Sequence, residues 1–516
     1  MLSKVRSFSF FGITGHDIEI EVDISNGIPA FEIVGLADTA VKESKERVRS
    51  AIRNNGYSFP IMRITVSLAP AFVKKEGSSF DLPIAVGILA ATGQLSLRGG
   101  ERYGFIGELA LDGAVRQVNG VLPMSIRARA SGLEALFVPA ANALEAAVVE
   151  GLNVLPVGAL NDVVRYFAGE CEIPRAIVDA RGLLTGAPAA EYDFCEVRGQ
   201  EQAKRALEIT ASGGHHCIMI GPPGSGKTML AKRLPSILPA LTYDESVEIT
   251  MIHSVAGMLP PGVSLIAARP FRNPLTTASA ASLTGGGKLP KPGEISLAHN
   301  GVLFLDELPE FGAQALDTLR QPLEDGVVTV SRVASKVTYP ARATFVCAAN
   351  PCKCGYYGDA RRACVCRPAE IRSYFGRISG PLLDRIDIQI EVRLQEYDEL
   401  YKDKQSGELS ADIRKRVEKA RRVQKDRYAG ANIYTNAQLE GGMVGRYCEL
   451  DRGSRALIRG AFERMALTAR AHDKILKIAR TIADLDGADR IGEKHLAEAI
   501  GYRCFDRSYF RAAGDA

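Results

Sequence analysis

Two short segments of the sequence hold residues that could do chemistry together. Residues 221–228 read Gly-Pro-Pro-Gly-Ser-Gly-Lys-Thr, which fits the G-x-x-x-x-G-K-S/T pattern of a phosphate-binding loop. In such a loop, backbone N–H groups surround the phosphates, the lysine reaches the β- and γ-phosphates, and the hydroxyl binds Mg²⁺. We therefore predict a nucleotide site made by Gly221, Pro222, Pro223, Gly224, Ser225, Gly226, Lys227 and Thr228.

The second segment ends in two acidic residues. Residues 301–307 read Gly-Val-Leu-Phe-Leu-Asp-Glu, so that an apolar run is followed by Asp306 and Glu307. Asp306 is expected to hold Mg²⁺, directly or through water, and Glu307 to polarise an attacking water. Alone, the two acids could equally be a solvated strand end. Beside a phosphate loop, they indicate hydrolysis of a nucleoside triphosphate.

The sequence also predicts the elements that must position these residues. The apolar run at 216–220 predicts a strand before the loop, and residues 229–234 predict the start of a helix after it. A phosphate loop needs this strand–loop–helix order, because the helix N-terminus and the backbone N–H groups both favour an anion. Residues 302–305 predict the strand that ends at Asp306.

Length and composition favour a globular protein with several domains. The chain has 516 residues, of which 46% are hydrophobic and 24% charged, enough for three or four domains with large cores. The net charge of +4 conceals an excess of basic residues after position 400, which permits nucleic-acid contact without establishing it. The sequence shows no signal peptide, no apolar run of about 18 residues and no secreted disulfide framework, so we expect a cytoplasmic protein.

Hydrophobic periodicity divides the chain into domains. Residues 1–175 predict an α/β domain, 176–195 a linker, 196–395 a nucleotide-binding domain, and 396–516 a helical domain. Strands are expected at 61–68, 136–139 and 343–349. Helices are expected at 82–92, 141–149, 413–428, 455–471 and 475–485.

Further motifs give the chain a family resemblance. They lie at 197–200 (Val-Arg-Gly-Gln), 213–216 (Gly-Gly-His-His), 269–272 (Arg-Pro-Phe-Arg), 380–387 (Gly-Pro-Leu-Leu-Asp-Arg-Ile-Asp) and 469–484. With them, nearly the whole chain resembles the ComM/YifB family of magnesium-chelatase-like AAA+ ATPases. The resemblance implies an α/β protein with a Lon-peptidase-like N-terminal domain, an AAA+ P-loop NTPase core with a parallel sheet, and a C-terminal helical lid.

The resemblance also implies a function. It implies a homohexameric ring that uses ATP and Mg²⁺, binds single-stranded or branched DNA, and drives branch migration as a helicase in recombination and natural transformation. No small-molecule substrate other than ATP and no membrane contact is expected. The alternative is the ATPase subunit of a metal-chelatase-type remodelling complex that is not directed at DNA. Such a subunit is not expected to carry the long N-terminal domain or the cysteine cluster.

Three more site residues follow from matching the family's motifs. Asn350 resembles sensor 1, a polar side chain that helps to place the attacking water. Arg385 resembles an arginine finger, which a neighbouring subunit would direct at the transferring phosphate. Arg470 resembles sensor 2 of the helical lid. From the residues alone, Arg385 could instead pair with Asp384 or Asp387, and Arg470 could lie on a solvated helix face.

The Lon-like resemblance raises the question of peptidase chemistry. Ser79, in Glu-Gly-Ser-Ser-Phe-Asp, lies where that fold carries its nucleophile. A Ser–Lys dyad needs a lysine that takes the hydroxyl proton. Pro123 stands at the matching position, and no lysine lies between Lys75 and Lys204. We therefore predict a non-peptidase scaffold that serves assembly or DNA contact.

Residues 352–366 hold four cysteines in two pairs. Cys352, Cys354, Cys364 and Cys366 have C-x-C spacing within each pair. Four thiolates could close a tetrahedral Zn²⁺ site, although C-x₂-C is the more usual spacing. Free thiols in a reduced loop, or a redox pair, are the alternatives.

Two segments are candidates for DNA contact. One is the insertion at 269–291, which contains Lys288 and a Gly-Gly-Gly run that predicts mobility. The other is a predicted hairpin at 324–338, which presents Arg332 and Lys336. The resemblance places such loops in the pore of a ring, where basic side chains could follow phosphates without reading sequence. Ordinary exposed turns are the alternative.

Overall fold

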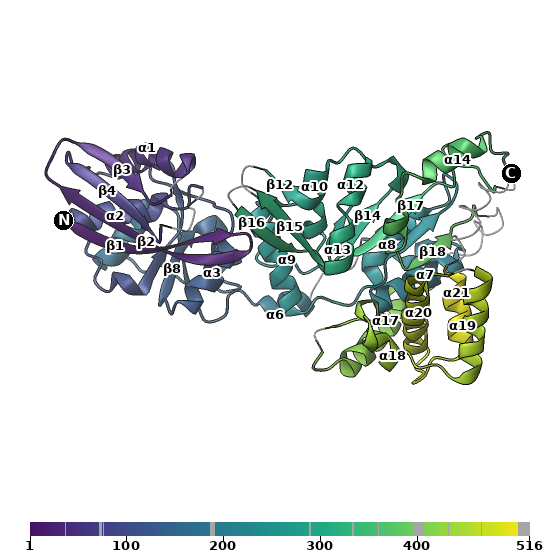
Figure 1. Ribbon diagram of the computed structural model, residues 1–516. Helices are drawn as coiled ribbons and strands as arrows, with labels where there is room; N and C mark the ends of the chain where they lie inside the picture. The colour runs from purple at the N-terminus through teal and green to yellow at the C-terminus, as the bar shows by residue number, and fades with distance from the viewer. Residues whose placement is uncertain are drawn as a thin grey trace. The chain divides into compact units, whose positions relative to one another are not determined.

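The chain forms two compact units in the computed structural model (Figure 1). The first unit comprises Met1–Ala187 and Thr242–Ala267, and the second comprises Pro188–Leu241 and Ala268–Ala516. The residues that the structure describes are 1–36, 38–71, 75, 77–185, 191–287, 290–332, 335–359, 361–395, 407–431, 433–465 and 467–503. In this part of the chain, no helix is both long and apolar enough to cross a membrane.

A seven-stranded mixed sheet in the order β3-β4-β2-β1-β5-β8-β9 forms the centre of the first unit. β1 and β2 are paired antiparallel, whereas β5, β8 and β9 run parallel. The strands are β1 (Leu2–Phe11), β2 (Thr14–Ser25), β3 (Ala30–Val34), β4 (Arg63–Ala69), β5 (Tyr103–Phe105), β8 (Ala135–Pro139) and β9 (Asn153–Val157). The helices of the same unit are α1 (Thr39–Asn54), α2 (Asp81–Ala91), α3 (Val121–Ala130), α4 (Ala143–Ala146), α5 (Leu160–Ala168), α6 (Ala180–Thr185) and α9 (Tyr243–Ala256).

Hydrogen bonds hold α9 in the first unit, although it follows the phosphate-loop helix in sequence. The buried carboxylate of Glu145 accepts hydrogen bonds from the hydroxyl of Ser254 and, at 2.9 Å, from the backbone N–H of Leu122. The hydroxyl of Tyr243 donates to the carbonyl oxygen of Val148 at 2.9 Å. Because these groups are buried or half-buried, separating α9 from the unit would leave polar atoms without partners.

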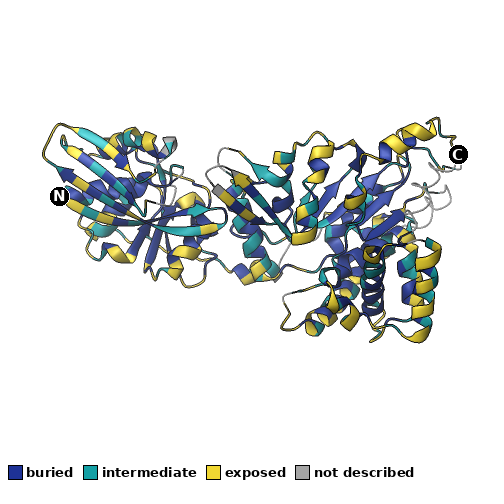
Figure 2. Ribbon diagram, viewed as in Figure 1, coloured by how far each residue is buried: buried dark blue, intermediate teal, exposed yellow. Residues whose placement is uncertain are grey.

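A five-stranded parallel sheet in the order β11-β14-β17-β10-β18 forms the centre of the second unit. The strands are β10 (Cys217–Ile220), β11 (Phe271–Arg272), β14 (Val302–Leu305), β17 (Thr344–Ala349) and β18 (Ile388–Glu391). The central strands are buried almost throughout (Figure 2), as is usual for a parallel sheet covered on both faces. Helices of this part are α7 (Glu201–Gly213), α8 (Lys227–Ile237), α13 (Arg320–Asp325), α14 (Pro368–Phe375) and α15 (Gly380–Leu383).

The C-terminal helices share one hydrophobic core with this sheet. Buried side chains of β10 and β18 belong to the same cluster as Ile475, Ile478 and Ile482 of α20. These helices are α17 (Ser410–Arg427), α18 (Gly442–Tyr447), α19 (Arg452–Met465), α20 (Ala469–Leu485) and α21 (Glu493–Gly501). The common core explains why the sheet and the helices form a single compact unit.

Several element boundaries differ from the sequence prediction. The helix expected at 455–471 is wrong: α19 ends at Met465, and α20 begins at Ala469. The side chain of Thr468 accepts a hydrogen bond from the backbone N–H of Ala471, so Thr468 is the N-cap of a new helix. The expected helix at 141–149 is reduced to the single turn of α4. Part of the expected linker is also helical, because α6 begins at Ala180, which is buried in the core of the first unit.

Candidate active site

The carboxyl ends of three neighbouring parallel strands bring the predicted hydrolysis residues together. β10 leads into the phosphate loop, β14 into Asp306, and β17 into Asn350. Thr228 Oγ1 donates to Asp306 Oδ2 at 2.7 Å, and Lys227 Nζ donates to Asn350 Oδ1 at 3.2 Å. Direct contacts therefore connect all three strand ends, at the sheet edge where parallel α/β proteins bind ligands.

The backbone of the phosphate loop depends on its glycines. Gly224 and Gly226 have φ values of 79° and 89°, in the left-handed region that favours glycine. Gly221 lies so close to the carbonyl oxygen of Val392 that a Cβ atom would collide with it. Helix α8 begins at Lys227, within the last two residues of the loop, so the free N–H groups of its first turn are available to an anion.

The Lys227 side chain is folded onto the loop. Its Nζ donates to the carbonyl oxygens of Gly221 at 2.8 Å and Pro222 at 3.0 Å, and the residue is 8% exposed. Burial lowers the pKa of Lys227, while the charges of Asp306 and Glu307 act in the opposite direction. Phosphate oxygens would replace two neutral acceptors with charged ones, which form stronger hydrogen bonds to an ammonium.

Asp306 and Glu307 differ in backbone conformation and exposure. Asp306 is half-buried, and its Oδ1 accepts the backbone N–H of Glu307 at 3.0 Å. Glu307 has a φ of 50°, a left-handed conformation that is costly for a residue with a side chain, and it is exposed. The turn therefore directs the carboxylate of Asp306 to Thr228 and leaves the carboxylate of Glu307 exposed to solvent.

Asn350 lies between Lys227 and α14. Its side-chain oxygen accepts from Lys227 Nζ, and its backbone is close enough to Tyr374 of α14 to act on the pKa of that hydroxyl. Burial raises the pKa of Tyr374 to about 12, so its hydroxyl stays neutral. The hydrogen bond from Lys227 places the side-chain amide of Asn350 next to the loop.

The two predicted arginines lie apart from this group. Arg385 forms an ion pair with Glu324 of α13, instead of Asp384 or Asp387, and its Nη1 donates to the carbonyl oxygen of Pro381 at 2.7 Å. Arg470 is exposed in the first turn of α20. Among the described residues, neither arginine has a hydrogen bond or ion pair with the phosphate loop.

The sequence prediction missed a buried polar network next to Arg385. Asp387 pairs with His215 Nδ1 at 3.2 Å and with Lys474 Nζ at 2.9 Å, and His215 Nε2 lies 2.8 Å from Thr481 Oγ1. Burial opposes the charge of Asp387, but Lys474 and His215 hold the pKa of this carboxyl well below its usual range. In the sequence, the Gly-Gly-His-His and Leu-Asp-Arg-Ile-Asp motifs were the features that could have indicated this network. The network ties α20 to the segment that carries Arg385.

The structure contains the hairpin expected as a DNA contact. β15 (Val327–Arg332) and β16 (Ser335–Pro340) are paired antiparallel, and Lys336 is exposed. The side chain of Arg332 and the whole of Lys288 lie outside the described residues.

In the other insertion, the glycines serve close packing. Gly285 and Gly286 form β12 (Gly285–Gly286), which pairs antiparallel with β13 (Lys291–Pro292). A Cβ atom on Gly285 would collide with the carbonyl oxygen of Lys291. These two glycines therefore allow two backbones to approach, a role that the sequence did not indicate.

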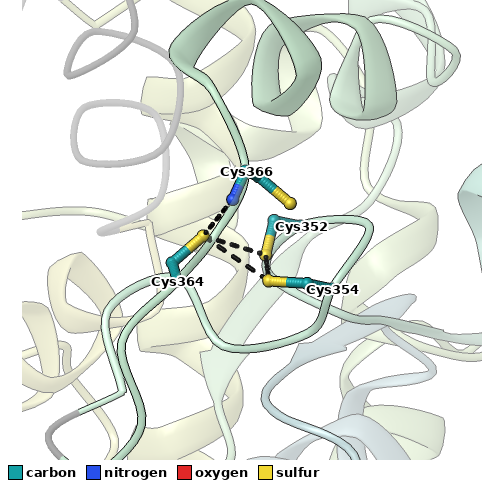
Figure 3. Close-up of side chains that lie close together, drawn as sticks. All are labelled: Cys352, Cys354, Cys364 and Cys366. Atoms are coloured by element: carbon teal, nitrogen blue, oxygen red, sulfur yellow. Dashed lines mark hydrogen bonds between the residues drawn. The ribbon is translucent and has the colours of Figure 1, made fainter.

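The four cysteines converge in the loop at 351–367 (Figure 3). The Sγ of Cys352 lies 3.3 Å from that of Cys354 and 3.6 Å from that of Cys364, and the Cys354–Cys364 distance is 3.6 Å. All four sulfur atoms, including that of Cys366, lie within 4.8 Å of one another. Desolvation opposes ionisation, but backbone N–H groups lower the pKa of Cys354 to about 6. All four thiols are free, so the cluster contains no disulfide.

The residues around Ser79 show how Lys75 of the first unit is held. Ser79 is 8% exposed, and Pro123 lies in the first turn of α3. Lys75 is buried, and its Nζ donates to the carbonyl oxygen of Pro70. The ammonium of Lys75 is thus engaged by a backbone carbonyl.

We expect Ser79→Ala to leave the ATPase rate within about twofold of wild type, because Ser79 belongs to the first unit and the phosphate loop to the second. A hydroxyl without a base is no nucleophile. The wild-type protein is expected to cleave neither casein nor short fluorogenic peptides. Both activities can be measured side by side on the same preparations. A peptidase activity that disappears in Ser79→Ala would contradict the scaffold interpretation.

Three family models match the chain. The model described as "Magnesium chelatase, subunit ChlI" matches residues 193–400, which include the phosphate loop, Asp306 and Asn350. "Subunit ChlI of Mg-chelatase" matches residues 20–142. "Magnesium chelatase, subunit ChlI C-terminal" matches residues 407–503.

Similarity to individual proteins extends over the whole chain. The chain is 43% identical over 507 residues to the uncharacterized protein YifB of Salmonella typhimurium, covering 98% of each chain. It is 43% identical over 510 residues to the competence protein ComM of Haemophilus influenzae, again covering 98% of each. The magnesium-chelatase 38 kDa subunit of Rhodobacter capsulatus is 25% identical over 330 residues, which cover 59% of this chain and 84% of that protein.

Proposed function

The chain belongs to the ComM/YifB family of magnesium-chelatase-like AAA+ proteins, and on this basis we propose that it is a hexameric, ATP-driven DNA motor. We infer that it acts as a branch-migration helicase in recombination and natural transformation. The observation that carries ATP hydrolysis is the 2.7 Å contact between Thr228 and Asp306, which joins the phosphate loop to the acidic strand end. The DNA assignment is supported by full-length similarity to a protein named for competence and by exposed Lys336 on the hairpin.

The side chains at the three strand ends have different roles in ATP hydrolysis. When ATP binds, Lys227 donates hydrogen bonds to the β- and γ-phosphates in place of the carbonyl oxygens of the loop. Asn350, which contacts Lys227, helps to place the attacking water. Glu307, which is open to solvent, takes up the proton of that water. Thr228 and Asp306 are the residues that would hold Mg²⁺, which neutralises charge on the phosphates when bound.

The ring assignment depends on Arg385. Within one chain, Arg385 pairs with Glu324 and does not bond to the phosphate loop. We infer that the arginine that completes the site comes from a neighbouring subunit, as the family resemblance implies, because a closed homohexamer supplies one to every site.

The ATPase subunit of a metal-chelatase-type complex is the second candidate. The similarity to a magnesium-chelatase subunit over 59% of the chain favours it. Such a subunit would respond to protein partners and not to DNA, so the two functions make different predictions for the same assay.

We expect branched DNA to raise the ATPase rate at least about tenfold, because DNA that contacts several subunits promotes the ring in which neighbouring arginines reach the sites. A labelled four-way junction should be converted to two duplexes in an ATP-dependent reaction. Rates with forked, four-way, duplex and no DNA would be compared at one protein concentration. Equal rates in all four, together with an intact junction, would favour the chelatase-type function.

A charge substitution on the hairpin tests where DNA acts. Lys336→Ala should weaken stimulation by DNA and leave the rate without DNA unchanged, since Lys336 is exposed outside the ATP site. Lys415→Ala is a matched control, because Lys415 is an exposed lysine on α17 that pairs with Asp412. If DNA stimulates the ATPase of both variants equally, the hairpin is not part of the DNA interface.

A further inference from the structure

The cysteine loop, residues 351–367, begins and ends at contacts with the ATP site. Its first residue follows Asn350 directly, and Asn350 accepts a hydrogen bond from Lys227. Its last residue leads into α14, whose Tyr374 lies near the backbone of Asn350. Both ends of the cysteine loop therefore lie close to one residue of the hydrolysis site, Asn350.

A turn within the cysteine loop also touches the phosphate loop. Gly355 has a φ of 87°, and a Cβ atom built on it would lie 2.5 Å from Cδ of Pro223. The backbone N–H of Gly355 donates to the carbonyl oxygen of Cys352 at 3.0 Å, so the turn and the first cysteine form one small structure. Only a residue without a side chain allows this approach.

The sulfur atoms are spaced for a single tetrahedral metal ion. A Zn–S bond of about 2.3 Å places two ligands of a tetrahedral site about 3.8 Å apart. The Sγ distances among Cys352, Cys354 and Cys364, which are 3.3, 3.6 and 3.6 Å, are close to this value, and all four sulfur atoms lie within 4.8 Å of one another. A disulfide would require about 2.05 Å, and a polynuclear iron–sulfur cluster would spread its thiolates over several irons. The backbone N–H of Cys366 also points at Cys364 Sγ, at 3.4 Å, as expected beside a metal-bound thiolate.

The cysteine loop has almost no apolar core that could fix it. Among its described residues, only Pro351, Cys352 and Gly355 are buried, and Val365 is 83% exposed. A segment of this composition needs another source of order, and metal binding supplies folding free energy directly.

We propose that Cys352, Cys354, Cys364 and Cys366 bind one Zn²⁺, and that this ion holds the cysteine loop against Pro223 and Asn350 so that the ATP site keeps its shape. Four protein ligands leave no open position, so the ion is structural and activates no water. The inference rests on the ATP site of the proposed function but not on DNA, so a failure of DNA stimulation would leave it standing.

The test measures bound zinc and nucleotide affinity on the full chain. Protein purified without chelators or a histidine tag should contain about one zinc per chain by plasma mass spectrometry. Cys364→Ser should lose the zinc and bind a fluorescent ATP analogue at least about tenfold more weakly, since a small displacement of binding groups has large effects on a pre-shaped site. Cys171→Ser is the matched control, because Cys171 is a half-buried free thiol of the first unit.

A second variant separates the contact from the metal. Gly355→Ala should retain zinc but weaken ATP-analogue binding, because its methyl group must displace the cysteine loop from Pro223. Gly430→Ala is the control for backbone strain: its φ is 84°, and nothing lies within 4 Å of its Cβ position. If Cys364→Ser does not fold, the same binding assay would be made on wild-type protein from which a chelator has removed the zinc.

Each outcome decides the proposal. Zinc in wild type, its loss in Cys364→Ser or after chelation, and weaker analogue binding in the zinc-free and Gly355→Ala proteins would support it. Absence of zinc from wild type would overturn the metal site. Unchanged analogue affinity after zinc loss, or in Gly355→Ala, would overturn the link to the ATP site.

Discussion

Replacing Glu307 with glutamine is expected to lower kcat for ATP hydrolysis by about 10²- to 10⁴-fold and to leave ATP binding intact. Glutamine has nearly the same shape but cannot take a proton from water. Lys227, Thr228 and Asp306, which contact one another or the loop directly, are unchanged in this variant. Steady-state ATPase rates and equilibrium binding of an ATP analogue would separate the two effects.

Two further variants make this result specific. Glu310→Gln removes an exposed carboxylate three residues away, which pairs with Arg377 at 3.0 Å, and it should leave kcat within about twofold, as expected of a surface ion pair. Lys227→Ala should abolish hydrolysis by removing the contact to the β- and γ-phosphates. A normal rate in Glu307→Gln would show that another group activates the water.

Arg385→Ala is expected to reduce kcat by about 10³-fold or more, because it removes the guanidinium that offsets charge on the transferring phosphate. ATP binding should persist, since Arg385 has no bond to the phosphate loop of its own chain. If Arg385 acts in a neighbouring subunit, as we propose, the wild-type rate per subunit should rise with protein concentration. ATPase rates over a concentration series, with light scattering to follow assembly, provide the measurement.

Mixing experiments test the action between subunits. Arg385→Ala chains mixed with Lys227→Ala chains should regain part of the activity, since some interfaces then pair an intact loop with an intact finger. Arg377→Ala, which removes an exposed arginine paired with Glu310, serves as the control and should behave like wild type. A rate per subunit that does not depend on concentration, without rescue in the mixtures, would indicate an ATPase that works as a monomer.

The sequence by itself determined the ATPase chemistry and the local elements that present it. The strand expected at 302–305 is β14, and the phosphate loop lies between β10 and α8 as expected. These features are local: a glycine pattern dictates a backbone, and an apolar run of four residues predicts a buried strand. Motif spacing also indicated the family, which the full-length similarity shows. Helix boundaries were predicted less accurately, because the N-cap at Thr468 divides a continuous helical pattern into two helices.

Only the tertiary structure decided which distant residues meet. From the sequence, Asp384 and Asp387 were the candidate partners of Arg385. In the structure, Arg385 pairs with Glu324, and Asp387 pairs with Lys474 and His215. It also sets Gly355 against Pro223, which are more than a hundred positions apart. Such contacts depend on the order of strands in the sheet and on a core shared with the C-terminal helices. A periodic pattern specifies which face of an element is buried, but it carries no information on which other element covers that face.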